Sequence, residues 1–191
     1  VGLDTLKSVS LTTYEKALED EERDMFQIPS ILENLIETGR LGQKTKSGFY
    51  KKNEDRSIHS LDLNTGEYKP MNTVRFNCVR VAKDRQNLAD RVKALCDGDD
   101  RGSMYFWEIT AKMLIYSANR IPEISDDIFN IDNAMKWGFG WEAGPFEFWD
   151  MLGIRKTVDR MKSESKVVPK WVLEMLESGR ETFYQIDDGI K

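Results

Sequence analysis

The sequence predicts a mainly α-helical protein in which one helical unit occurs twice, with a small β-hairpin inserted between the copies. Two observations lead to this prediction. Residues 29–39, "PSILENLIETG", and residues 169–179, "PKWVLEMLESG", share an initial Pro, an apolar stripe at helical spacing and a final Gly. Pro suits the first helical position, and Gly suits the left-handed residue just past a helix end. The stretch between the copies instead alternates short apolar and polar runs, as strands do.

The agreement between the copies extends beyond these two helices. Glu37 and Arg40 are matched by Glu177 and Arg180, and "VGLDTL" at the start resembles "LGIRKT" at 152–157. Such matching indicates duplication. A long aromatic stretch precedes "LGIRKT", whereas no residue precedes "VGLDTL". We therefore expect the chain to begin inside the first copy. The expected parts are a truncated first repeat (1–50), a hairpin and linker (51–81), and a second repeat with its leading helix (82–191).

Hydrophobic spacing places the individual elements. Leu3, Leu6, Val9 and Tyr14 follow helical spacing from the first residues onward. Asn64, Thr65 and Gly66 form a plausible tight turn between strands near 58–63 and 67–69, which gives one hairpin or two. Two more helices are expected, a first at 82–96 and a long central one at about 103–118.

Composition excludes several classes of function. The net charge of −5 argues against a nucleic-acid partner, because such binding rests on clustered Lys and Arg, and we expect no such cluster. No apolar run is long enough to span a membrane, and the start lacks the pattern of a signal peptide. Cys78 and Cys96 have no paired spacing and are expected to be reduced. A cytoplasmic location follows from these expectations.

The sequence offers no convincing catalytic or metal-binding residues. His59 is the only histidine, so neither a paired-His zinc site nor a relay with a second His can be built. The acidic loop at 97–102 lacks the alternating ligands of a calcium loop. The glycines at 138–144 follow a helix and have the wrong spacing for a dinucleotide fingerprint. We therefore predict no catalytic, cofactor-binding or metal-binding residue in this chain.

An aromatic stretch at 136–150, "KWGFGWEAGPFEFWD", allows two interpretations. Trp137, Phe139 and Trp141 alternate with glycines, and they are either part of the core or an apolar wall that faces a ligand or another domain. These three residues are our candidates for a substrate cleft. Phe146 and Trp149 follow a Gly-Pro pair that suits the start of a helix, and both are expected to be buried.

The same stretch resembles a known family. "IDNAMKWGFGWEAGPFEFWDMLG" looks like the signature of the helical C-terminal domain of L-3-hydroxyacyl-CoA dehydrogenases, in which an Ile-Asp-x-Ala-Met helix leads to a Gly-Pro-Phe-Glu turn. "VGLDTL" resembles the segment after that turn in the first copy, and "GRLGQKTKSGFY" resembles the glycine-rich end of the same domain. The duplicated arrangement is similar to that of bifunctional prokaryotic proteins in which the dehydrogenase is fused to an enoyl-CoA hydratase.

The resemblance implies a function for a longer parent protein. That parent would oxidise 3-hydroxyacyl-CoA to 3-oxoacyl-CoA in fatty-acid β-oxidation. A Rossmann domain upstream would bind NAD, and an enoyl-CoA hydratase domain would follow downstream. The family's catalytic histidine, glutamate and asparagine would all precede Val1. This chain would then supply the helical substrate cleft and a pseudo-dimer packing region, would hold no NAD itself, and would be inactive alone. The alternative is a helical interaction or scaffold module that keeps the fold without the chemistry.

Overall fold

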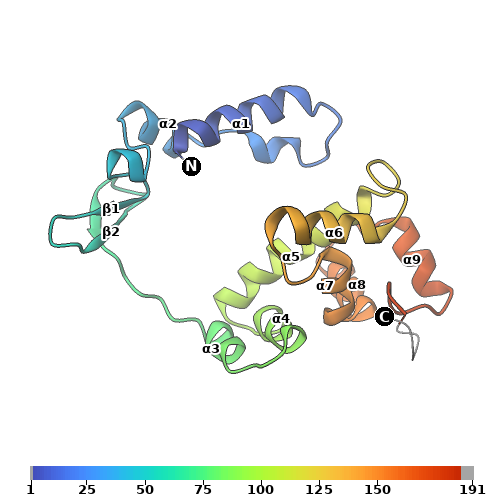
Figure 1. Ribbon diagram of the computed structural model, residues 1–191. Coiled ribbons are helices and arrows are strands. Elements are labelled where there is room, and N and C mark those ends of the chain that lie inside the picture. Colours follow the sequence, from blue (N-terminus) through green and yellow to red (C-terminus); the bar gives the residue numbers. More distant parts are fainter. Residues whose placement is uncertain (1, 186–191) are drawn as a thin grey trace. The chain divides into compact units, whose positions relative to one another are not determined.

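The computed structural model describes residues 2–185, and these fall into two compact units, residues 2–73 and residues 74–185. Figure 1 shows helices on both sides of one small sheet, which lies in the first half of the sequence. The predicted class, mainly α with a small β insertion, is confirmed. The sheet belongs to the first unit. The finer three-part division at 50 and 81 follows the sequence repeat and stays a prediction.

The first unit combines short helices with a three-stranded antiparallel sheet of order β1-β2-β3. Its elements are α1 (Leu3–Lys16), the 3-10 turns η1 (Arg23–Phe26) and η2 (Gln43–Thr45), α2 (Ser30–Glu37), β1 (Tyr50–Lys52), β2 (Ile58–Leu61) and β3 (Tyr68–Pro70). The predicted turn at 64–66 joins β2 to β3, with Gly66 at φ 71. Strand β1 adds a second hairpin, because it pairs with β2 through Tyr50 and Ser60.

The second unit contains seven helices in the part of the chain that is described. They are α3 (Asn77–Lys83), α4 (Leu88–Cys96), α5 (Arg101–Asn119), α6 (Ile128–Phe139), α7 (Pro145–Leu152), α8 (Ile154–Ser163) and α9 (Lys170–Glu177). Helix α5 confirms the predicted central helix. The prediction of one helix over 82–96 is wrong, because α3 ends at Lys83 and Asn87 starts α4 afresh by accepting a hydrogen bond from the Asp90 N–H at 2.8 Å.

Helices α2 and α9 end in the same way, one in each unit. The Gly39 and Arg40 amides donate to the carbonyls of Ile36 and Leu35. In the second unit Gly179 and Arg180 donate to Leu176 and Met175. Each pair is a Schellman motif, which needs the left-handed glycine, and φ is 71 at Gly39 and 87 at Gly179. Both helices have eight residues. The prediction of Gly caps is therefore confirmed for both helices.

The starts of these two helices differ slightly from the prediction. Pro29 and Pro169 lie one residue before the first helical position, with ψ of 146 and 137. These ψ values are extended, so each proline is the N-cap residue of its helix, and its ring fixes φ at that position. The two helices again agree with each other.

The two units differ in how much apolar surface they bury. In the first unit the buried apolar side chains are Leu32, Leu35 and Leu61, and α1 buries none of its residues. The second unit has a large core built from α4, α5, α7, α8 and α9. Most of the hydrophobic stabilisation therefore belongs to the second unit.

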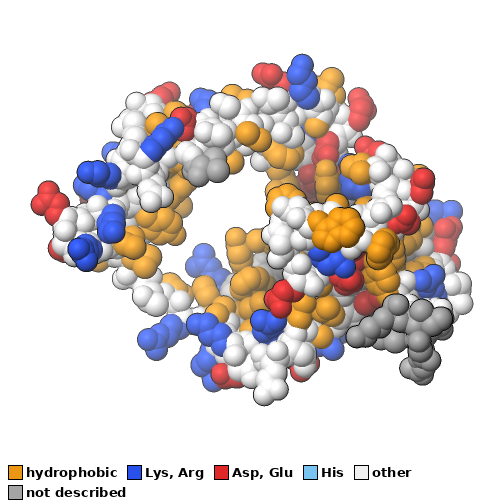
Figure 2. All heavy atoms as spheres, in the orientation of Figure 1, with side chains coloured by type: hydrophobic (Ala, Val, Ile, Leu, Met, Phe, Trp, Pro, Cys, Tyr) orange, Lys and Arg blue, Asp and Glu red, His pale blue; other side chains and the backbone are white. Residues whose placement is uncertain are grey.

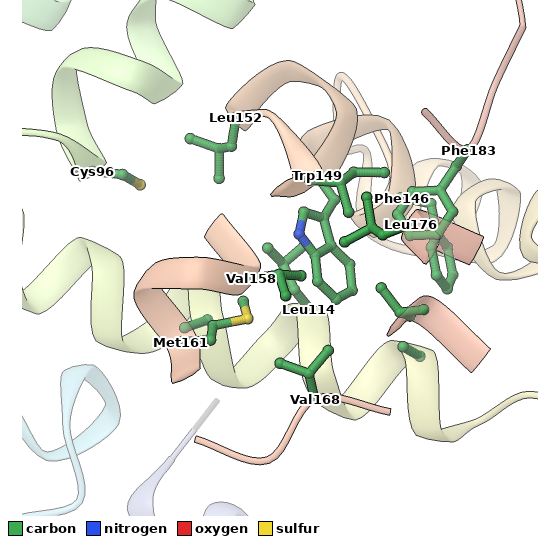
Figure 3. Close-up of a cluster of buried hydrophobic side chains, with 14 of the residues drawn as sticks. Cys96, Leu114, Phe146, Trp149, Leu152, Val158, Met161, Val168, Leu176 and Phe183 are labelled. Carbon is green, nitrogen blue, oxygen red and sulfur yellow. The ribbon is translucent and has the colours of Figure 1, made fainter. Parts of the chain in front are cut away.

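Aromatic rings form the centre of that core, as Figure 3 shows. The Phe183 ring lies between Phe146, at 5.0 Å between centroids, and Trp149, at 5.4 Å. Both partner side chains are fully buried, which confirms the prediction for Phe146 and Trp149. The indole N–H of Trp149 donates to the Thr157 hydroxyl at 2.7 Å, so the burial of its polar atom is compensated. No described helix is long and apolar enough to cross a membrane.

Candidate functional site

Two of the three predicted cleft residues lie on the surface. Trp137 is 82% exposed and Phe139 is 73% exposed, at the C-terminal end of α6. The helix ends there because Gly140 adopts the left-handed conformation, with φ 68. Of the two interpretations, burial in the core is therefore wrong for Trp137 and Phe139.

Trp141 has a different environment. Its half-buried ring packs edge-on against Phe148 with 6.3 Å between centroids. It lines a pocket of about 360 Å³, whose walls are Leu88, Thr110, Met113, Gly140, Trp141, Glu142 and Phe148. Glu142 forms an ion pair with Arg91 at 3.0 Å. The structure therefore brings Trp141, but neither of the other two candidates, to the wall of this pocket.

Asp132 is a key residue of this region that the sequence analysis did not single out. Its side chain is fully buried on α6. It accepts hydrogen bonds from the backbone N–H groups of Phe146, at 2.8 Å, and Glu147, at 3.1 Å, and from the Tyr184 hydroxyl at 2.8 Å. The first two donors are backbone N–H groups of the first turn of α7, which have no acceptor within their own helix. Asp132 thus caps α7 from another helix, and the Asp in "IDNAM" is the signal that could have revealed it.

Gly144 makes this cap possible. A Cβ atom built at Gly144 would lie 2.3 Å from the Cα and Cβ atoms of Asp132. The absence of a side chain at position 144 therefore lets α6 approach the start of α7. The Gly144 N–H donates to the Glu147 carboxylate at 2.7 Å, and Lys136 donates to the same group at 2.8 Å. The Gly-Pro-Phe-Glu sequence thus forms the N-cap and the first three helical residues of α7.

A second carboxylate on α7 holds the segment that follows α9. Asp150 accepts hydrogen bonds from the N–H groups of Phe183, at 2.8 Å, and Tyr184, at 3.0 Å. Burial raises the pKa of both Asp132 and Asp150, although the donated hydrogen bonds oppose this shift. These acids therefore link parts of the unit to each other, and their contacts are structural.

His59, Asp127 and the two cysteines have ordinary surroundings. His59 lies in β2 opposite Lys51 and Pro70. Asp127 caps α6 by accepting from the Asn130 N–H. Cys78 and Cys96 are free and buried. Within residues 2–185 no group of three or more His, Cys, Asp or Glu side chains could hold a metal ion.

Asp100, in the acidic loop at 97–102, joins two helices. Its carboxylate accepts from the N–H groups of Cys78, at 2.9 Å, and Ser103, at 2.8 Å, so it caps α5 and anchors α3. These hydrogen bonds lower the pKa of Asp100 to about 2. The loop is therefore a helix cap.

Asp100→Asn should reduce the dependence of stability on acid pH. Because the pKa of Asp100 is lower in the folded than in the unfolded state, its contribution to stability is present above about pH 4 and lost as the pH falls to about 2. Urea unfolding followed by tryptophan fluorescence across this range measures the effect, since all five tryptophans lie in the second unit. Asp99→Asn is the matched control, and an unchanged pH profile in Asp100→Asn would contradict the assignment.

Comparisons with known proteins identify the relatives of this chain. The family model described as "3-hydroxyacyl-CoA dehydrogenase, C-terminal domain" matches residues 1–52. A probable 3-hydroxyacyl-CoA dehydrogenase of Bacillus subtilis (strain 168) is 41% identical over 99% of this chain and 24% of its own length. A fatty acid oxidation complex subunit alpha of Aliivibrio fischeri (strain ATCC 700601 / ES114) is 30% identical over 76% of this chain and 18% of its own.

A putative fatty acid oxidation complex trifunctional enzyme of Rickettsia felis (strain ATCC VR-1525 / URRWXCal2) is 27% identical over 77% of this chain and 19% of its own length. The chain thus spans a quarter or less of these curated relatives. No solved structure matches it. The chain is a homologue of 3-hydroxyacyl-CoA dehydrogenases, and its first 52 residues belong to the C-terminal domain family of these enzymes.

Proposed function

We propose that the chain acts as part of an NAD-dependent L-3-hydroxyacyl-CoA dehydrogenase, which oxidises 3-hydroxyacyl-CoA to 3-oxoacyl-CoA in fatty-acid β-oxidation. The main support is the 41% identity to the probable dehydrogenase of Bacillus subtilis (strain 168) over nearly the whole chain. The names of the fatty acid oxidation relatives agree with this pathway. The proposed place of action is the cytoplasm.

In this proposal the nicotinamide is bound by a Rossmann domain elsewhere in the parent protein. Hydride transfer requires the nicotinamide and an acid/base pair to be held against the substrate. The sheet of the first unit is antiparallel and three-stranded, whereas dinucleotide binding of this kind uses a parallel sheet. We therefore assign no NAD contact to the described residues. An enoyl-CoA hydratase domain in the same parent is the proposed partner domain.

The helical units would form part of the substrate cleft and of the contacts between domains. We propose that Trp141 walls a substrate cleft of the parent, because its ring is half exposed beside an apolar pocket. The exposed rings of Trp137 and Phe139 suit contact with another domain. The matching ends of α2 and α9 support a further proposal, that the two copies replace a subunit contact by a pseudo-dimer within one chain.

The second candidate is a scaffold or interaction module. It is favoured by the contacts of Asp132 and Asp150, whose hydrogen bonds all serve packing within the second unit. A module of this kind would keep the cap of α7 and need no contact with substrate.

Kinetics of the parent protein separates the two candidates. The chain alone should produce no NADH from a 3-hydroxyacyl-CoA, and the parent should produce it. In the parent, Trp141→Ala should raise the Michaelis constant about tenfold, which corresponds to the loss of one well-packed aromatic contact, with little change in melting temperature. Trp137→Ala is the matched control for loss of an indole. An inactive parent would favour the scaffold, and unchanged kinetics in Trp141→Ala would remove Trp141 from the cleft.

A further inference from the structure

One short segment joins the two compact units, and the division between them falls between Thr73 and Val74. Residues 71–76 carry no helix or strand, and Figure 1 draws the segment that leads to α3 as a plain trace. Within residues 2–185, none of residues 71–75 forms a hydrogen bond or an ion pair. We call residues 71–75 the connector. No hydrogen bond has to break before the connector adopts a fully extended conformation.

Both ends of the connector are anchored, one in each unit. Pro70 is the last residue of β3 and pairs with His59 of β2. At the other end Phe76 is the N-cap residue of α3. A Cβ atom built at Gly102 would lie 2.7 Å from the Phe76 ring, so this ring packs against the first turn of α5. The backbone between these two anchors is the part that another protein could bind without disturbing either unit.

Exposure of an apolar side chain does not by itself single out the connector. Figure 2 shows hydrophobic side chains at the surface of both units. Val74 is 67% exposed, but Val167 is 83% exposed. Val167 is followed by the buried Val168, and the Lys166 N–H before it donates to the Met161 carbonyl at 2.9 Å. Extending the chain at Val167 would therefore disturb the core, whereas extending it at Val74 breaks no hydrogen bond.

We propose that the Thr73–Val74 bond is a site of limited proteolysis, cut by a zinc endopeptidase that prefers a large apolar residue after the cleaved bond. Endopeptidases bind their substrates as extended strands through the backbone of the substrate. A segment inside a helix must first unfold locally to bind in this way, which costs free energy. The connector needs no such unfolding, and the exposed Val74 side chain is available to the apolar pocket of the enzyme. The proposal does not depend on the proposed function.

The cut itself is a hydrolysis that needs only water and the endopeptidase. The zinc-bound water attacks the carbonyl carbon of Thr73, and the bond from that carbon to the Val74 nitrogen breaks. One proton of the water passes to the Val74 nitrogen. The products are a carboxylate on Thr73 and a new amino terminus on Val74, with no change of oxidation state.

The second unit should remain folded after the cut. The new amino terminus at Val74 lies two residues before the Phe76 anchor. Just beyond that anchor, the Cys78 N–H donates to the Asp100 carboxylate at 2.9 Å and ties α3 to the start of α5. The core formed by α4, α5, α7, α8 and α9 contains no residue before Val74. Cleavage therefore removes no contact from this core.

Thermolysin, a zinc endopeptidase of this specificity, tests the proposal on the full chain under native conditions. Mass spectrometry should show that the first cut falls at the Thr73–Val74 bond. The melting transition seen by tryptophan fluorescence should be the same before and after the cut, since all five tryptophans lie in the second unit. Val74→Asp should slow the first cut at least about tenfold, because an apolar pocket rejects a side chain that does not fill it.

Val167→Asp is the matched control, because it makes the same change at a valine that is even more exposed. It should leave the rate of the first cut unchanged. A first cut at any other bond would overturn the proposal, and so would a chain that stays intact. Equal rates of cleavage in Val74→Asp and the unchanged chain, or a product without a melting transition, would overturn it as well.

Discussion

Phe146→Ala is expected to lower the free energy of unfolding of the second unit by about 3–5 kcal/mol, because removing a buried phenyl ring loses its transfer free energy and leaves a cavity. Phe146 is fully buried and its ring contacts Trp171 and Phe183, at 6.1 and 5.0 Å between centroids. Urea unfolding followed by tryptophan fluorescence measures the loss.

Trp137→Ala is the matched control for Phe146→Ala. Trp137 belongs to the same aromatic stretch, but its side chain is 82% exposed. Its removal should change the free energy of unfolding by no more than about 0.5 kcal/mol. Equal losses in the two variants would show that Trp137 is part of the core and would contradict the packing described above.

Gly144→Ala is expected to destabilise the second unit by at least about 3 kcal/mol, at the upper end of overpacking effects. The new methyl group would lie 2.3 Å from atoms of Asp132. Relief would require α6 to move away from α7, which would break the hydrogen bonds from Phe146 and Glu147 to the Asp132 carboxylate. The melting temperature and the urea midpoint both report the effect.

Gly138→Ala provides the control in the same glycine-rich segment. A Cβ atom at Gly138 would meet nothing within 4 Å, and the residue lies inside α6. Ala should therefore raise the stability by about 0.5–1 kcal/mol, because it restricts the unfolded chain more than Gly does. The expected changes in stability have opposite signs for the two substitutions, so the comparison tests the close approach of Gly144 to Asp132. If Gly144→Ala were neutral or stabilising, the cap of α7 by Asp132 would not depend on a glycine at this position.

The sequence was most informative where one residue type serves one local purpose. Gly39 and Gly179 were predicted as left-handed helix ends, since few other residues adopt positive φ without strain. Phe146 and Trp149 were predicted to be buried because they lie one turn apart on the helix that a Gly-Pro pair starts. The break at 84–87 was missed because an Asn cap inside an otherwise periodic stretch is a weak signal.

The candidate sites were harder to predict because they depend on distant contacts. Asp132 and Tyr184 are 52 residues apart, and nothing in the local sequence joins them. Trp137 and Trp141 look alike in the alternating sequence, yet one lies on an exposed helix end and the other packs on Phe148.

The docking of Phe183 and Tyr184 has a consequence for the order of folding during synthesis. The ribosome makes these residues after every described helix of the second unit, yet the Phe183 ring lies at the centre of the aromatic core and the Tyr184 hydroxyl reaches Asp132. A nascent chain that ends before Phe183 lacks these contacts and leaves Asp150 without the two amides that it holds in the native unit. Closure of the core must therefore wait until Phe183 and Tyr184 have been made, and until then the apolar faces of the earlier helices are open to aggregation.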